Sequence, residues 1–192
     1  IKKKWDDLTD WDIFYKESDP FNVYEGGLSE GERKKHEKLV KVLDDSKGTL
    51  LDIGCGEGYF TNKYCEKFTK TYAADISGLA IKRASQRYGS KISFFKWDIS
   101  EPIPKQYNFF YDNVLISEVL YYIEPKKMDK VIRNIYDVVR PRGGRIVISV
   151  GHEYSGNNIK SFFNNFIWDE EIEVLAHGKF YSTIVKGEKG CG

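Results

Sequence analysis

Short apolar runs alternate with amphipathic, helix-like segments through the middle of this chain. Five runs have the length and composition of buried strands: Thr49–Ile53, Thr71–Ala74, Ile92–Lys96, Asn113–Ser117 and Arg145–Val150. Helix-like segments occupy about 58–68, 79–88 and 126–139 between them. Because strand and helix alternate, the pattern predicts an α/β fold with a mostly parallel sheet and helices on both faces.

The two ends of the chain depart from this alternation. Residues 1–28 are rich in aromatic and acidic side chains and predict an irregular cap or lid. Ser29 and Glu32 then form a capping-box pattern, which predicts a helix through about Val42. Beyond residue 155 the pattern predicts a helix and then a hairpin with a tight turn at His177-Gly178, in the segments Asn158–Phe166, Glu171–Ala176 and Lys179–Val185. We expect one domain, with a cap at 1–28, a ligand-binding core at 45–150, and the helix and hairpin at 151–192.

Composition narrows the class of protein. The chain has 192 residues, 31% of them charged and 15% aromatic, which is typical of a folded domain with a real core. Its 30 basic and 29 acidic side chains nearly cancel, so a nucleic-acid partner is disfavoured. No apolar run approaches the ~18 residues that span a bilayer. Three cysteines without zinc or disulfide spacing favour a reducing, cytoplasmic setting, in which we expect a monomer or homodimer.

A glycine-rich turn follows the first strand and carries the strongest functional signal. The pattern is D-x-G-x-G-x-G, from Asp52 through Gly54 and Gly56 to Gly58. A dinucleotide fingerprint requires its third glycine at position 59, where this chain has tyrosine, and the phosphate-loop lysine is also absent. An acid at this strand end suits a cationic ligand better than a pyrophosphate. S-adenosylmethionine carries an α-ammonium and a sulfonium, and its carboxylate can accept from the N–H groups of the turn.

Two further acids follow the next two strands. Asp75 closes the second strand, 21 positions after Gly54, where a carboxylate can accept from both ribose hydroxyls of an adenosine. Asp98 follows the third strand and is placed to accept from the adenine amino group, with Trp97 or Ile99 packing on the ring. Three acids after three successive strands therefore predict an adenosine-containing cation as the ligand.

The chain resembles the class I S-adenosylmethionine-dependent methyltransferases over about residues 48–150. The resemblance rests on LDIGCGEGYF, AADIS, KWDIS, YDNVLISEVLYYI and VVRPRGGRIVIS. It implies a Rossmann-like, doubly wound, seven-stranded sheet with an antiparallel terminal strand, which agrees with the hairpin above. It also implies cofactor-binding roles for Asp52, Gly54, Gly56, Asp75, Ile76 and Asp98, with Ser117 beside the methionine moiety. We add Cys55, Trp97, Ile99, Tyr24 and Arg33 as cofactor-binding candidates, Arg33 for the cofactor carboxylate.

Within this superfamily the chain resembles nodulation-type N-methyltransferases, which methylate an amine on a chitooligosaccharide. The segment SEVLYYI after the fourth strand carries this resemblance, together with Ser18-Asp19-Pro20-Phe21 and the helix that contains Glu32-Arg33-Lys34-Lys35. It implies an amine acceptor, with an amino sugar as the first guess and a hydroxyl group as the second.

Candidate residues for the chemistry lie after the fourth and fifth strands. Glu118 is placed to orient an amine or take its proton, or alternatively to satisfy a helix N-terminus. His152 titrates near neutrality and is the best single base, with Glu153 beside it, although a surface loop histidine is an equal alternative. Tyr121 and Tyr122 are candidates for lining the acceptor pocket, and Tyr122 also for catalysis, or else for core packing. Tyr15, Tyr24 and Trp11 are candidates for a lid over the cofactor, and Tyr15 also for binding substrate, or else for anchoring the cap.

Other functions are disfavoured but not removed. Metal-dependent small-RNA methyltransferases place Glu-x-x-Glu-His after this strand, where this chain has Glu118-Val119-Leu120-Tyr121-Tyr122, so we expect no metal. The Asn-Pro-Pro-Tyr signature of nucleobase amine methylation is also absent. Methylation of RNA or protein remains an alternative within enzymes. A nicotinamide oxidoreductase and a non-catalytic adenosylmethionine-binding or scaffold protein are alternatives from other classes.

Overall fold

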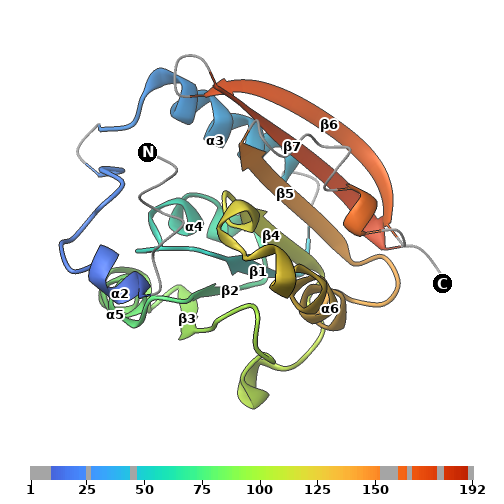
Figure 1. Cartoon of the computed structure of the whole chain (residues 1–192), viewed down its shortest axis with the longest axis horizontal. Helices are drawn as coiled ribbons and strands as arrows, with labels where there is room; N and C mark the ends of the chain where they lie inside the picture. Colours follow the sequence, from blue (N-terminus) through green and yellow to red (C-terminus); the bar gives the residue numbers. More distant parts are fainter. Residues whose placement is uncertain are drawn as a thin grey trace.

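The computed structural model describes residues 10–24, 27–43, 47–151, 160–163, 166–176 and 180–189. In these residues seven strands form one sheet in the order β3-β2-β1-β4-β5-β7-β6 (Figure 1). The strands are β1 (Thr49–Ile53), β2 (Lys70–Asp75), β3 (Ile92–Lys96), β4 (Asn113–Ser117), β5 (Arg145–Gly151), β6 (Phe166–Ala176) and β7 (Phe180–Lys189). Strands β1 to β5 pair in parallel, whereas β7 is antiparallel to both β5 and β6. The predicted seven-stranded sheet with an antiparallel last strand is confirmed.

Helices connect the strands at the expected places. The helices are α2 (Trp11–Phe14), α3 (Glu30–Val42), α4 (Tyr59–Tyr64), α5 (Gly78–Tyr88) and α6 (Met128–Val138), with short 3-10 turns η1 (Cys65–Lys67), η2 (Lys105–Tyr107), η3 (Leu120–Tyr122) and η4 (Pro125–Lys127). The capping box predicted for α3 is present, because the Ser29 and Glu32 side chains each accept from the other residue's backbone N–H. The helix expected at 58–68 divides into α4 and η1.

Alternate positions of each strand face opposite helical layers. Leu50 of β1 packs in one core cluster with Leu39 of α3 and Tyr64 of α4. Leu51, the next residue, packs in the other cluster with Ile132 and other residues of α6. Helix α5 packs on β2 and β3. Helices therefore cover both faces of the sheet, as predicted, and α2 lies beside α5 at one side of it (Figure 1).

The sequence pattern misplaced the boundary between the late helix and the hairpin. Residues 160–162 are helical, but Phe166, the expected end of that helix, begins β6 and pairs with Lys189 of β7. Phe166 is buried and the next residue, Ile167, is 69% exposed, so the burial has the two-residue period of a strand. The ring of Phe166 packs against Phe163 and Trp168. The aromatic cluster at this end of the sheet therefore favours strand over helix, and both hairpin strands are longer than expected.

Candidate active site

The turn after β1 needs glycine for two reasons: its backbone angles disfavour side chains, and neighbouring atoms leave no room for them. Gly54, Gly56 and Gly58 have φ angles of 81°, 54° and 79°, in the left-handed region that disfavours side chains. The N–H groups of Gly54 and Cys55 both donate to the carbonyl of Ala74, at 2.8 and 3.0 Å, which ties the turn to the end of β2. A Cβ on Gly54 would lie 2.1 Å from the Val119 side chain. The turn is therefore closed on one side by the segment that follows β4.

Asp75 links the end of β2 to this turn. Its Oδ2 accepts from the N–H of Gly56 at 2.9 Å, and its Oδ1 accepts from the N–H of Ser77 at 2.8 Å. The side chain is only 7% exposed, and this burial raises the pKa of Asp75. Ile76, the next residue, is exposed beside it. The structure thus brings together the glycine turn and the acid that the sequence predicts for the ribose, while the ribose contact itself stays a prediction.

Asp52 is held by helix α4. Its Oδ2 accepts from the Thr61 hydroxyl at 2.5 Å and from the Tyr64 hydroxyl at 2.6 Å. Burial raises the pKa of Asp52 to about 6. The sequence predicts a cationic ligand for this carboxylate. The three-residue spacing of Thr61 and Tyr64 on one helix face is a local clue to these other partners. Its contacts position the glycine turn against α4, and a direct contact with a cofactor stays a prediction.

This raised pKa predicts a pH-dependent stability that Asp52→Asn should remove. A carboxyl group with a higher pKa in the folded state binds its proton more tightly there, so its contribution to stability is lost as pH rises through about 6. Relative to Asp52→Asn, the wild type should gain about 1 kcal/mol in unfolding free energy between roughly pH 7.5 and pH 5. Urea denaturation at several pH values measures this difference. Parallel pH dependences of the two proteins would contradict the assignment.

The residues predicted to hold the adenine ring are divided between a turn and the core. Asp98 is half-buried, and its Oδ1 accepts from the N–H and hydroxyl of Ser100 at 2.9 and 2.7 Å. Trp97 and Ile99 are each 5% exposed and belong to the core cluster shared with α6. The Trp97 indole N–H donates to the carbonyl of Glu101 at 2.8 Å. Both apolar side chains thus have core partners in the structure, and the adenine contacts stay predictions.

An ion-pair cluster attaches the N-terminal segment to the glycine turn. Glu57, inside the turn, is 5% exposed and accepts from Arg83 Nη1 at 3.0 Å and also from Arg87 Nη1, both on α5. It further accepts from the N–H of Asp19 at 2.9 Å and the hydroxyl of Ser18 at 3.2 Å. Burial alone would raise the pKa of Glu57, but these hydrogen bonds outweigh it and hold the pKa below its usual value.

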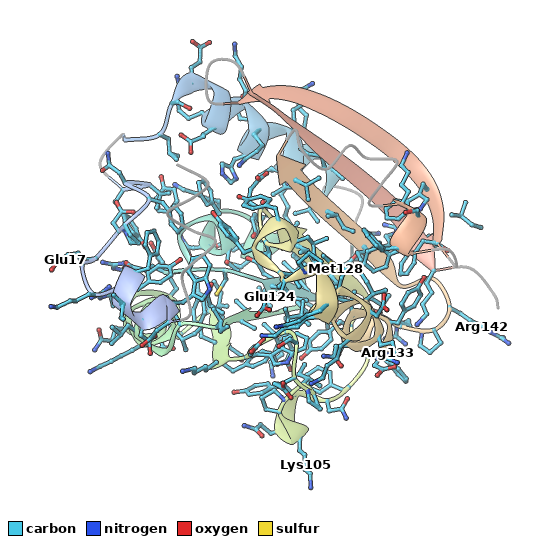
Figure 2. All side chains as sticks on the ribbon, viewed as in Figure 1. Glu17, Lys105, Glu124, Met128, Arg133 and Arg142 are labelled. Atoms are coloured by element: carbon cyan, nitrogen blue, oxygen red, sulfur yellow. The ribbon has the colours of Figure 1, made fainter. Side chains whose placement is uncertain are left out.

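The same helix anchors the segment at two more points. Arg83 donates to the carbonyls of Tyr15 and Lys16, at 2.7 and 3.0 Å, just after α2. Asp12 accepts from the Ser77 hydroxyl at 2.6 Å, at the start of α5. Glu17, between these contacts, lies at the outer edge of the molecule (Figure 2). The sequence does not indicate these partners, although Glu57 lies inside the glycine motif and Arg83 and Arg87 share a helix face at i, i+4 spacing.

The aromatic residues of this segment lie against the turn, which suits both a lid and an anchor for the cap, so the lid over the cofactor stays a prediction. Tyr15 is 4% exposed, and a Cβ on Gly56 would lie 2.9 Å from its hydroxyl. Burial raises the pKa of Tyr15 well above its usual value. The hydroxyl of Tyr24 donates to the Glu57 carbonyl at 3.2 Å. The Trp11 and Tyr122 rings meet edge to face with centroids 4.9 Å apart, so α2 contacts the turn η3 that follows β4.

The segment after β4 carries the candidate catalytic residues. Glu118 has a left-handed backbone with φ of 57°, and its Oε1 accepts from the Ser149 hydroxyl at 2.7 Å. The ring centroids of Tyr121 and Tyr122 lie 4.4 Å apart. Burial, together with the nearby Glu118, raises the pKa of Tyr121. Ser117, the last residue of β4, is partly exposed. The structure therefore groups the predicted acid and both tyrosines beside the glycine turn.

One predicted residue does not join this group, and two others lie outside the part of the chain that the structure describes. Arg33 is exposed on α3, and the neighbouring Lys35 is the basic residue that faces inward. His152 and Glu153 lie outside the described residues, as does the His177 turn. Among the residues that the structure does describe, no cluster of three or more His, Cys, Asp or Glu side chains could hold a metal ion. No helix in the described ranges is long and apolar enough to cross a membrane.

Comparison with known protein sequences identifies the central part of the chain. Residues 50–143 match the family model of a methyltransferase domain. Nodulation protein S of Sinorhizobium fredii is 28% identical over 119 residues, covering 58% of this chain and 53% of that protein. Human tRNA N(3)-cytidine methyltransferase is 28% identical over 141 residues, covering 68% and 48%. The chain thus spans about half the length of these curated relatives.

Solved structures with the same fold include known methyltransferases. The N-methyltransferase NodS of Bradyrhizobium japonicum, in complex with S-adenosyl-L-homocysteine, superimposes with a TM-score of 0.75 at 23% identity, covering 90% of this chain and 93% of that one. Magnesium protoporphyrin IX methyltransferase of Synechocystis with bound SAM gives 0.73 at 18% identity, covering 98% and 97%. Together with the family match, these likenesses confirm the class I methyltransferase fold expected from the sequence.

Proposed function

The chain carries a class I S-adenosylmethionine-dependent methyltransferase domain, and we propose that this domain methylates an amine of a small molecule, without a metal. An amino sugar is the first acceptor to test, and a hydroxyl group is the second. The observation that carries the proposal is the hydrogen bond from Gly56 to the buried Asp75, which joins the glycine turn to the acid predicted to bind the ribose. The amine preference draws on the N-methyltransferase among the relatives in fold.

The binding site for the cofactor lies along the carboxyl ends of β1, β2 and β4. Gly54 and Gly56 have no side chain to keep a ligand from the backbone of the turn, and Asp75 offers carboxylate oxygens to the ribose hydroxyls. Tyr15 and Tyr24 cover the turn from the N-terminal side. S-adenosylmethionine, when bound, supplies a methyl group already activated by a sulfonium.

The protein's part in the reaction is then chiefly to position the acceptor. The acceptor nitrogen attacks the methyl carbon as the carbon–sulfur bond breaks, and much of the rate comes from holding the nucleophile within about 3–3.5 Å of that carbon. Glu118, Tyr121 and Tyr122 border this space, and Glu118 is placed to accept a hydrogen bond or a proton from the acceptor. His152, which follows β5 in the sequence, remains a candidate base.

A second candidate function is methylation of RNA. It is favoured by the similarity to a human tRNA methyltransferase that covers 68% of this chain. The near-zero net charge weighs against it, because nucleic-acid binding draws on positive potential. We propose that the residues of this chain form one domain, in a cytoplasmic monomer or homodimer, as the sequence predicts.

Two measurements test the proposed function. Calorimetry should detect binding of S-adenosylmethionine and S-adenosylhomocysteine but not of NAD. An assay for S-adenosylhomocysteine release should give its largest signal with an amino sugar or small amine, among a panel that also includes hydroxylated aromatics and RNA. Binding of NAD alone would refute the proposal. Cofactor binding without release across the panel would favour the non-catalytic binding or scaffold protein, and release with RNA alone would favour the second candidate.

A further inference from the structure

A short turn after β3 carries Asp98, the acid that the sequence predicts for the adenine amino group. The carbonyl of Asp98 accepts from the N–H of Glu101 at 2.8 Å, and this hydrogen bond closes the turn. The N–H of Trp97 donates to the carbonyl of Asp75 at 2.9 Å, so the start of the turn lies against the end of β2. An adenosine whose ribose binds to Asp75 would therefore have its base near this turn.

The carboxylate of Asp98 is held through one of its two oxygens. Its Oδ1 accepts from both the N–H and the hydroxyl of Ser100, at 2.9 and 2.7 Å. Ser100 is buried, whereas Asp98 is half-buried. Within the part of the chain that the structure describes, no residue donates a hydrogen bond to Oδ2. The turn thus leaves one carboxylate oxygen available to a donor on a ligand.

Helix α6 holds this turn from a distant part of the sequence. Nδ2 of Asn134 donates to the carbonyls of Ile99 and Glu101, at 2.7 and 3.0 Å. Because carbonyls accept and never donate, only the nitrogen of the amide can satisfy both, and this fixes the orientation of the amide. The Glu101 carbonyl also accepts from the Trp97 indole N–H at 2.8 Å. One side-chain amide therefore bridges two carbonyls of the turn and constrains its shape.

A second contact from the same helix constrains the turn less. Lys130, about one helical turn before Asn134, pairs with the Glu101 carboxylate, and its Nζ lies 3.0 Å from both oxygens. The two side chains are 45% and 61% exposed, so water and salt screen the pair. Asn134 itself is half-buried and adjoins the buried Ile135. The amide is therefore the main contact by which α6 holds the turn.

We propose that Asn134 is a positioning residue for recognition of the base: it holds the turn so that Oδ2 of Asp98 accepts a hydrogen bond from the adenine amino group. This inference rests on the proposed function, because it requires an adenosine cofactor in the site. A hydrogen bond weakens steeply as its angle departs from linear, so a turn that is held in place strengthens the contact. An oxygen in place of the amino group would repel the carboxylate, and the site should therefore discriminate between the two bases.

Calorimetry with two ligands tests this role. S-inosylhomocysteine differs from S-adenosylhomocysteine by an oxygen in place of the adenine amino group. The wild type should bind S-adenosylhomocysteine at least about tenfold more tightly, because a carboxylate placed for a donor rejects a ligand that lacks it. Asn134→Ala should reduce this preference about fivefold through weaker binding of S-adenosylhomocysteine, while the affinity for S-inosylhomocysteine should not fall. A merely structural role would weaken both ligands equally or neither.

Two further variants sharpen the test. Arg133→Ala is the matched control, because Arg133 precedes Asn134 on α6 and is exposed, and it should keep the wild-type preference. Asn134→Asp keeps the shape of the side chain but replaces the donor by an acceptor, so it should reduce the preference at least as much as Asn134→Ala. Alanine favours the helix more than asparagine does, so α6 should stay folded in Asn134→Ala. If that variant is unstable, Asn134→Asp gives the same comparison.

The possible failures are distinguishable. A wild-type preference in both Asn134 variants, or an equal loss of affinity for both ligands, would overturn the role of Asn134. Equal binding of the two ligands by the wild type would overturn the contact between Asp98 and the adenine amino group, and with it this inference, but would leave the proposed function in place. Failure of the wild type to bind either ligand would refute the proposed function and this inference together.

Discussion

Asp75→Ala is expected to weaken S-adenosylhomocysteine binding about 100-fold, which corresponds to about 2.8 kcal/mol. The substitution removes the acceptor proposed for the ribose hydroxyls. It also removes both oxygens that accept from the N–H groups of Gly56 and Ser77, so the turn itself loses its anchor. Hydrogen bonds to a charged group contribute about 1.5–3 kcal/mol each, so the loss should exceed tenfold even if the turn keeps part of its shape. Calorimetry measures the effect.

Asp98→Asn is the matched control for this prediction. Asp98 also follows a strand of the sheet, but its carboxylate accepts hydrogen bonds from Ser100, within its own turn. Asparagine keeps an acceptor oxygen, so we expect the affinity to fall less than about tenfold. Wild-type affinity in Asp75→Ala, or an equal loss in both variants, would refute the ribose assignment of Asp75.

Among the variants discussed, Glu57→Ala should lower stability the most, with an expected loss of about 2 kcal/mol of unfolding free energy. The reason is that Arg83 and Arg87 would lose the buried carboxylate that joins them to the glycine turn. Breaking a fully buried pair costs about 3–5 kcal/mol, and we expect less here because both arginines are partly exposed. Urea denaturation measures the loss. Limited proteolysis should cut residues 10–24 faster in the variant, because Ser18 and Asp19 would lose their acceptor.

Lys91→Met is the control for this second prediction. Lys91 follows α5 in the sequence and pairs with Glu66, but both side chains are more than half exposed. Water and salt screen an exposed pair of this kind, so it contributes little to stability and the variant should unfold almost like the wild type. Equal stabilities of Glu57→Ala and Lys91→Met would show that the Glu57 cluster does not anchor the N-terminal segment.

The sequence determined the elements whose signals are local. Five parallel strands, the capping box of α3 and the glycine turn were all predicted within a residue or two, because hydrophobic period and glycine spacing are encoded in neighbouring positions. Asp75 was predicted as the acid of the second strand, and the fold places it against the turn, since the carboxyl ends of parallel strands meet at one edge. The start of β6 was missed because an aromatic cluster, not local period, decides it.

Only the tertiary structure decided which charged and aromatic side chains meet. Glu57 and Arg83 are 26 positions apart, and Lys35 and Glu118 are 83 apart, so no spacing rule relates them. A carboxylate near the end of a strand can face a ligand or a helix. The sequence predicts a ligand for Asp52, whereas in the structure its side chain accepts hydrogen bonds from two hydroxyls of α4. The sequence shows which positions carry a charge and which lie at the end of a predicted strand. The packing of distant segments sets its partner, and a charge that is removed from water requires one.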